Sequence, residues 1–153
     1  MDKKELRLDY SVYRNSFPEE FRNLCEEAVK ATDRSYSIYS KFSVGAALLL
    51  DNGEVLTGSN QENVAYPSGT CAERTVLFYA GATYPDTGVK ALAIAACYQG
   101  ALTETFTPPC GACRQVMAEV IKRYKKDFDV IMIGRQETVV LKASSLLPFS
   151  FDF

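Results

Sequence analysis

Histidine is absent from this sequence of 153 residues. Its absence excludes Ser-His-Asp and Cys-His nucleophile systems, histidine general bases and every metal site with a histidine ligand. Any proton transfer must therefore use carboxylates, lysine, tyrosine or thiols. Cysteine occurs five times. An odd number in a chain expected to be cytosolic is more typical of metal-binding or catalytic thiols than of a disulfide framework.

The sequence also has no run of about 18 apolar residues, the length that a membrane-spanning helix needs. Residues 1–9 are too polar for the core of a signal peptide. The net charge is −2 and the isoelectric point is near 5.2, whereas proteins that bind phosphate backbones normally present a basic face. We therefore expect a cytoplasmic protein whose partners include neither a membrane nor a nucleic acid.

The order of the expected elements indicates one layered α/β domain over residues 17–153. Residues 1–16 form an N-terminal extension of unassigned role, and apolar and polar residues alternate over 5–12, which predicts a short strand or an ordered arm. Two roles are open for it: covering a sheet edge, or taking part in a subunit contact. The patterns predict helices at 17–31, 71–82 and 110–124, and strands at 43–50, 54–59, 91–96, 129–133 and 137–142.

Three residues join the last two strands, and this short link makes them antiparallel, since a parallel return needs a crossover of about a dozen residues. Helices on both faces of a mixed sheet follow from this order. The sequence therefore predicts a three-layer α/β/α domain with a mixed five-stranded sheet.

Two thiols of a C-x-x-C motif, Cys110 and Cys113, follow a double proline at an expected helix start. They lie one helical turn apart and face a common point, and the free N–H groups of a helix start favour thiolates. Cys71 has the same position at the start of the preceding helix. Three thiolates at two helix N-termini can supply three corners of a zinc tetrahedron and leave the fourth for water.

Two other interpretations of these cysteines are a closed structural zinc site and a redox C-x-x-C motif. A closed site needs Cys25 or Cys97 as the fourth ligand. Cys25, however, lies on an apolar helix stripe, and Cys97 ends an expected buried strand. Redox chemistry leaves Cys71 without a role.

An open catalytic site is favoured by Glu73, because a carboxylate two residues after Cys71 projects beside the metal without being a ligand. The pattern Cys71-x-Glu73 with Pro109-Cys110-x-x-Cys113 is the three-cysteine form of the zinc-deaminase signature. Arg74, next to Glu73, is predicted to donate to the thiolate sulfurs and to offset their negative charge.

Longer segments around this signature resemble the small cytidine deaminases that act on free nucleosides, and together they cover roughly residues 17–151. The resemblance implies a cytidine-deaminase-like fold and zinc-dependent hydrolysis of cytidine and deoxycytidine in pyrimidine salvage, with release of ammonia. It also implies one Zn²⁺ per subunit and a homotetramer with shared active sites. The N-terminal extension is longer than the family norm. The matching segments are 39–48, 58–63, Tyr66, Cys71-Ala72-Glu73-Arg74-Thr75, 109–116 and Leu146-Leu147-Pro148-x-x-Phe151.

The resemblance also implies a role for each matching residue. Zinc would be bound by Cys71, Cys110 and Cys113, and Glu73 would be the proton shuttle. The residues implied in substrate binding are Phe42 (base stacking), Asn60 and Glu62 (ribose recognition), Ala72, and Tyr66 and Phe151, which would line a neighbouring subunit's pocket.

For Asn60 and Glu62, ordinary loop polarity after a strand is the alternative interpretation. A buried Glu62 that accepts a ribose hydroxyl would reject compounds lacking that hydroxyl, because its own hydrogen bond would go unmade. Its charge would also repel a nearby phosphate and so disfavour nucleotides and polynucleotides.

Three other functions remain open. A polynucleotide-editing deaminase is disfavoured by the acidic isoelectric point, the absence of a histidine ligand and the antiparallel final strands. A deaminase of a nucleoside-like antibiotic such as blasticidin S is disfavoured by Glu62 and Arg74. A non-enzymatic zinc module is distinguished from all of these by zinc content together with an absorbance assay on cytidine.

Overall fold

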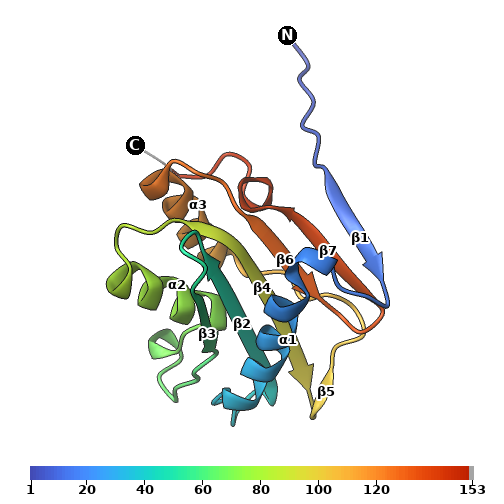
Figure 1. The fold of residues 1–153 in the computed structure, drawn as a ribbon, viewed down its shortest axis with the longest axis vertical. Coiled ribbons are helices and arrows are strands. Elements are labelled where there is room, and N and C mark those ends of the chain that lie inside the picture. The colour runs from blue at the N-terminus through green and yellow to red at the C-terminus, as the bar shows by residue number, and fades with distance from the viewer. Residues whose placement is uncertain (152–153) are drawn as a thin grey trace.

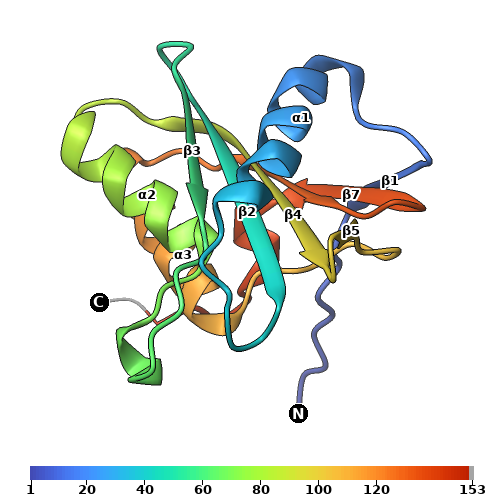
Figure 2. The same ribbon diagram turned by 90° about the horizontal axis from the view of Figure 1, so that it is seen from below.

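A mixed sheet of seven strands separates the helices into two layers in the computed structural model, which describes residues 1–151 (Figures 1 and 2). The strand order is β1-β7-β6-β4-β2-β3, and β5 pairs with β4. The expected α/β/α layering is therefore confirmed. The elements are β1 (Tyr10–Arg14), a 3₁₀ turn (Glu19–Phe21), α1 (Arg22–Ala31), a 3₁₀ turn (Thr32–Arg34), β2 (Phe42–Leu50), β3 (Val55–Ser59), a 3₁₀ turn (Tyr66–Ser68), α2 (Ala72–Thr83), β4 (Val89–Tyr98), β5 (Ala101–Leu102), α3 (Gly111–Tyr124), β6 (Asp129–Ile133), β7 (Glu137–Lys142) and a 3₁₀ turn (Ala143–Leu146).

The strand count of five is wrong, although all five expected strands are present. The two further strands are β5, which is too short to show a periodicity, and β1, which pairs antiparallel with β7 from Tyr10↔Leu141 to Arg14↔Glu137. The alternation over 5–12 thus marks the right segment, but only residues 10–14 lie opposite β7. β4 and β6 pair in parallel, and β6 and β7 pair antiparallel as expected.

Successive side chains of β4 point to opposite faces of the sheet, as in any strand. Ala91, Ala93 and Ala95 pack in the cluster that includes residues of α1, whereas Leu92 and Ile94 pack in the cluster that includes residues of α2 and α3. Figure 2 shows α1 on one side of the sheet and α2 and α3 on the other. The small side chains let α1 approach closely, and the larger ones fill the space under α2 and α3.

The first turn of α2 lies directly on β3. A Cβ atom at Gly58 would come within 2.9 Å of the Ala72 carbonyl oxygen and of the Val76 backbone nitrogen, so only glycine fits there. The Thr75 hydroxyl donates to the Ser59 carbonyl at 3.3 Å and adds a second tie between the same elements. The N-terminus of α2 is thereby fixed beside the end of β3.

The helix expected at 17–31 begins later than its sequence suggests. Residues Glu19–Phe21 form a 3₁₀ turn, and the α-helix starts at Arg22. α2 and α3 confirm the other two expected helices to within one residue at each end.

Candidate active site

Three thiols meet where α2 and α3 begin. Cys71 and Cys110 are the N-cap residues of the two helices, and Cys113 lies in the first turn of α3. Their sulfur atoms all lie within 4.8 Å of one another, with 3.8 Å between Cys71 Sγ and Cys110 Sγ and 3.5 Å between Cys110 Sγ and Cys113 Sγ. The structure thus brings together the three cysteines that the spacing singled out.

This donor set fits a zinc ion. With zinc–sulfur bonds of about 2.3 Å, two ligands at tetrahedral corners lie about 3.8 Å apart. The Cys71–Cys110 separation equals that value, and the Cys110–Cys113 separation is slightly shorter. Cys110 is exposed whereas Cys113 is buried, so the cluster is accessible from one side only.

The thiols differ in their tendency to ionise. The pKa of Cys71 is lowered to about 5, chiefly by a hydrogen bond from Cys113 and further by one from Arg74. The same contact raises the pKa of Cys113, which acts as the donor and is also buried. Each thiol also lies at a helix start, where the backbone dipoles favour negative charge. Cys71 therefore becomes a thiolate more readily than Cys113.

Arg74 makes the contact that its position predicts. Its Nη2 donates to Cys71 Sγ at 3.7 Å. Its Nε is buried and has no hydrogen-bond partner. The guanidinium thus places positive charge directly against the thiolate cluster.

Glu73 is buried in the first turn of α2, with only 4% of its surface exposed. Burial raises the pKa of its carboxyl, with a smaller contribution from the negative charge of Cys71. A raised pKa brings the titration of a carboxyl closer to neutral pH, which suits a group that must both accept and donate a proton.

The thiol cluster opens into a cavity of about 650 Å³. This volume lies within the range typical of small-molecule sites. The lining includes Phe42, Asn60, Glu62, Tyr66, Cys71 and Glu73. A carboxyl suited to acid–base chemistry, the thiol cluster and predicted substrate-binding side chains thus line one cavity.

Comparisons with known proteins identify the family. Residues 18–125 match the family model described as cytidine and deoxycytidylate deaminase zinc-binding region. The chain belongs to this family. It is 42% identical to a cytidine deaminase of Halalkalibacterium halodurans over 128 residues, which are 84% of this chain and 91% of that protein.

Solved structures of the family share the fold. A cytidine deaminase structure from Burkholderia pseudomallei has a TM-score of 0.73 at 37% identity and covers 88% of this chain and 100% of its own. One from Mycobacterium tuberculosis has a TM-score of 0.69 at 31% identity and covers 89% of this chain and 100% of its own. The predicted family and fold class are thereby confirmed.

In this cytidine deaminase family member, Asn60 is held by its own chain. Its Oδ1 accepts from the Val44 backbone N–H at 2.7 Å and from the Ser35 hydroxyl at 2.6 Å. Its Nδ2 donates to the Phe42 carbonyl at 2.9 Å. The amide therefore has a structural function, since it ties the end of β3 to the start of β2, and one Nδ2 hydrogen remains for a ligand.

Glu62 is half-buried, which corrects the expectation of a buried carboxylate. It accepts from the Tyr39 backbone N–H at 2.8 Å and from the Ser40 N–H at 3.3 Å. Hydrogen bonding by Ser40 lowers the pKa of Glu62, so the carboxylate stays ionised. The sequence had given no sign of these backbone partners, because they lie 22 and 23 residues away.

The remaining expected substrate residues take different positions. Phe42 lines the cavity, and its ring lies 6.4 Å from that of Tyr98. Tyr66 also lines it and is 77% exposed, with its ring 6.4 Å from that of Tyr39. Ala72 is fully buried in the core under α2 and does not line the cavity, because its side chain points into the packing of α2 on the sheet.

Phe151 is 75% exposed and lies outside this cavity, with its carbonyl accepting from Gln115 of α3. Its expected place in a neighbouring subunit's pocket stays a prediction. Thr107 and Pro108 also line the cavity although their roles were not anticipated. The double proline before α3 was the signal that could have indicated them.

Cys25 and Cys97 lie away from the cluster of three thiols, as expected. Cys25 is buried in the core between α1 and the sheet. The Cys97 thiol donates to the Thr32 hydroxyl at 3.5 Å.

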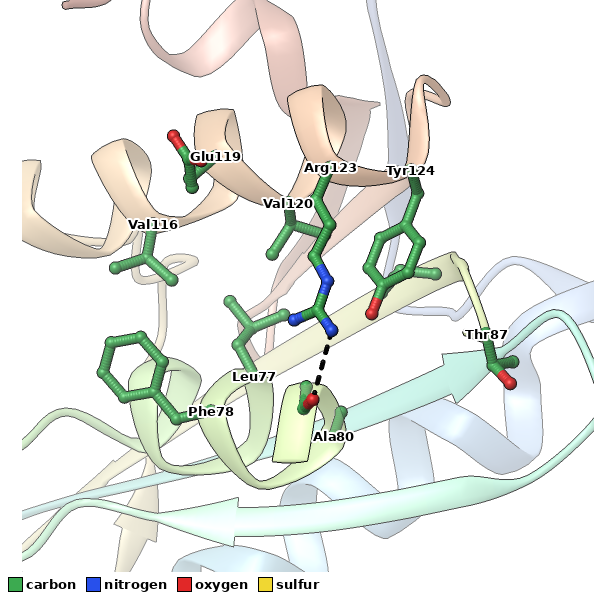
Figure 3. A pocket seen from close by; sticks show the side chains of 11 residues that line it. Leu77, Phe78, Ala80, Thr87, Val116, Glu119, Val120, Arg123 and Tyr124 are labelled. Atoms are coloured by element: carbon green, nitrogen blue, oxygen red, sulfur yellow. Dashed lines mark hydrogen bonds between the residues drawn. The ribbon is translucent and has the colours of Figure 1, made fainter. Parts of the chain in front are cut away.

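A second cavity, of about 230 Å³, lies between α2 and α3 and has a different character (Figure 3). Its walls are mainly apolar, with Leu77 and Val120 among them. Arg123 crosses from α3, and its Nη2 donates to the carbonyls of Gly81 at 3.4 Å and Pro85 at 3.0 Å. Arg123 thus ties the C-terminal end of α3 to the C-terminal end of α2. The three thiols and Glu73 lie at the N-terminal ends of the same two helices.

Proposed function

We propose that this protein hydrolyses the free nucleosides cytidine and deoxycytidine to uridine and deoxyuridine and releases ammonia, as in pyrimidine salvage. The observation that carries the proposal is the buried carboxyl of Glu73, which faces the same 650 Å³ cavity as the thiol cluster. The cytidine deaminases from Halalkalibacterium halodurans and Sporosarcina psychrophila, each 42% identical to this chain, support the substrate class.

Cys71, Cys110 and Cys113 would hold one zinc ion per subunit. When bound, the ion supplies the positive charge that makes a water molecule nucleophilic near neutral pH. The three thiolates supply one more negative charge than the ion neutralises. Arg74, which donates to Cys71 Sγ, offsets part of this excess.

Glu73 moves the protons. It takes one proton from the attacking water and delivers it to ring N3 of the base. It then takes the proton of the new C4 hydroxyl and delivers it to the amine, so that the C4–N bond breaks, ammonia leaves and the C4 carbonyl forms. One carboxylate can serve all three atoms because C4 and N3 are adjacent in the ring. The raised pKa of Glu73 suits a group that must accept and donate in the same cycle.

Phe42, Asn60 and Glu62 orient the nucleoside. The Phe42 ring stacks on the base, the free Nδ2 hydrogen of Asn60 donates to a ribose oxygen, and Glu62 accepts from a ribose hydroxyl. Glu62 is ionised and held by two backbone N–H groups. It therefore repels a phosphate, which favours nucleosides over nucleotides.

We further propose that the protein is a cytoplasmic homotetramer whose subunits complete one another's active sites. Tyr66 and Phe151 are large aromatic side chains that one subunit leaves mostly exposed, and a neighbouring subunit would cover both. None of the helices in residues 1–151 combines the length and apolar character needed to span a membrane.

One experiment tests the activity. The purified protein is analysed for zinc, and the loss of cytidine absorbance is followed in parallel with deoxycytidine, cytidine monophosphate and single-stranded DNA. We expect one zinc per chain and turnover of both nucleosides alone. Bound zinc with no turnover of any substrate would mean a non-enzymatic zinc module, and turnover of the DNA would mean an editing deaminase.

A further inference from the structure

The strand β1 forms an open edge of the sheet. It pairs with β7 on one side, and in residues 1–151 no other strand pairs with its outer side. Its two faces are also nearly bare, since only Tyr13 is half-buried. Exposed edges of this kind pair readily with another chain unless proline, a bulge, charged side chains or a covering segment blocks them, and the only charged residue of β1 is Arg14 at its end. β1 contains no proline, and its register with β7 runs without a bulge.

Residues 1–9 continue β1 as an arm that leads away from the body of the molecule (Figure 1). All nine residues are exposed. The apolar alternation continues through the arm into the strand, with Leu6, Leu8, Tyr10 and Val12 on one face, and all four are exposed. The alternation of apolar and polar residues, which is typical of a strand, thus extends into residues 1–9, where no strand in residues 1–151 of the same subunit pairs with them.

The directions of the backbone N–H and C=O groups identify the residues of β1 that face the open edge. The Asn15 N–H donates to the Gln136 carbonyl at 2.9 Å, on the β7 side. In an antiparallel ladder, alternate residues point their N–H and C=O groups to opposite sides. The groups of Tyr10, Val12 and Arg14 therefore point outward. The outward-facing residues of a partner strand must consequently pair with the even-numbered residues of β1.

The charged face of the arm alternates in sign. Lys3, Glu5, Arg7 and Asp9 follow one another at every second position. Such a pattern is complementary to itself when two copies run antiparallel in a suitable register. Charge complementarity therefore points to a second copy of this chain as the partner.

We propose that residues 2–14 of two copies pair antiparallel across a twofold axis at Leu8, which joins their two sheets into one. In this register Leu8 faces Leu8 and Leu6 faces Tyr10 on the apolar face, while Arg7 faces Asp9 on the charged face. Asp2 also faces Arg14. Since all the even-numbered residues then face even-numbered residues, the outward-pointing backbone groups of β1 find partners.

Neighbouring registers are less favourable. With the axis at Arg7, Arg7 faces itself and Glu5 faces Asp9. With the axis at Asp9, two Asp9 carboxylates face each other. Like charges directly opposite are destabilising in a sheet. The axis at Leu8 avoids every like-charge pair and retains the apolar contacts. An axis at Leu6 also avoids like charges, but it leaves Val12 and Arg14 of β1 with no residue opposite them.

This contact lies at the opposite edge of the sheet from β3, the strand that leads into the active-site loop. The proposal is therefore independent of the proposed activity, and nucleoside turnover serves as a check that each variant is folded.

Cross-linking of the full chain tests the pairing. Paired residues of this type have Cα atoms about 5.5 Å apart, within the range that a disulfide spans. Mild oxidation of the Leu8→Cys protein should give a covalent dimer on non-reducing gels. The matched control is Ser11→Cys, also exposed and near the edge, which faces Glu5 and lies about 20 Å from its own copy in the partner. Equal cross-linking of the two variants, or none above the unsubstituted protein, would overturn the proposal.

Charge reversal then tests the register. Adding Arg7→Glu to the Leu8→Cys protein places like charges opposite each other at two symmetry-related positions, and should lower the cross-linked fraction roughly tenfold. Adding Asp9→Arg as well restores opposite charges and should restore the cross-link. A fraction that ignores Arg7→Glu, or that Asp9→Arg fails to restore, would count against the twofold axis at Leu8.

Discussion

Arg74 donates from Nη2 to the sulfur of Cys71 at 3.7 Å, while its Nε is buried without a hydrogen-bond partner. A buried donor left unpaired is costly. We infer that the attraction between the guanidinium charge and the thiolates offsets this cost and keeps Arg74 in place. This pair links the thiol cluster to the helix that carries Glu73. It also makes Arg74 a positioning and charge-balancing residue whose removal can be measured.

Replacing Arg74 by glutamine should lower the rate of cytidine deamination about 10- to 100-fold, the usual effect of losing a group that supports a metal ligand. The fold should be retained. Rates and zinc content are measured together, with Arg123→Gln as the matched control. Arg123 binds the carbonyls at the end of α2, so its loss should reduce stability and leave the rate per zinc unchanged. Equal rates for the two variants would contradict the role assigned to Arg74.

Replacing Glu73 by glutamine should reduce turnover by about 10²-fold or more, because the amide cannot shuttle a proton. Glutamine keeps the size of the side chain and has no charged form whose burial is unfavourable, so the variant should be at least as stable as the parent. Thermal unfolding and the rate are followed on the same zinc-loaded samples. Near-normal turnover would show that another group carries the proton.

The metal side of the site was predictable from sequence because its spacings are local. Cys110 and Cys113 are one turn apart at the start of α3, and Cys71 and Glu73 lie at the start of α2, so helix geometry alone brings the members of each pair close together. Only the proximity of the starts of α2 and α3 depends on the tertiary structure and could not be derived from local spacing.

The nucleoside side was less predictable. Asn60 reaches Val44 and Phe42 across the β2–β3 pair, 16 and 18 residues back in the chain. Nothing in the local sequence distinguishes such a tie from loop polarity. β1 shows the same limit, because its alternation marks a strand but cannot identify β7 as the neighbour that begins at Glu137.

Replacing Asn60 by alanine should weaken both folding and binding. The change leaves the Val44 N–H and the Phe42 carbonyl without their partner, which costs about 1–3 kcal/mol for a buried polar group. Glu62→Gln is the matched comparison. It should raise the KM for cytidine with a smaller loss of stability, because the groups that Glu62 binds are exposed. Urea unfolding and steady-state kinetics separate the effects, and an unchanged unfolding free energy for Asn60→Ala would contradict the structural tie.

Cys25 should make the free energy of unfolding fall as the pH becomes alkaline. Burial between α1 and the sheet, reinforced by the nearby charge of Glu26, raises the pKa of its thiol from 9.0 to about 12. Above the lower value the unfolded chain loses this proton while the folded chain keeps it, so the free energy of unfolding falls as the pH rises from 9 toward 12. Near pH 10 the loss amounts to about 1.4 kcal/mol, one pH unit beyond the unfolded pKa. Cys25→Ala should be less stable than the parent near pH 7 by about 1 kcal/mol, because it leaves a small cavity, and should close that gap near pH 10, where it has no thiol to ionise. Urea unfolding of both proteins at the two pH values measures the difference. A gap that stays constant between them would mean that the Cys25 thiol ionises equally well in the folded protein.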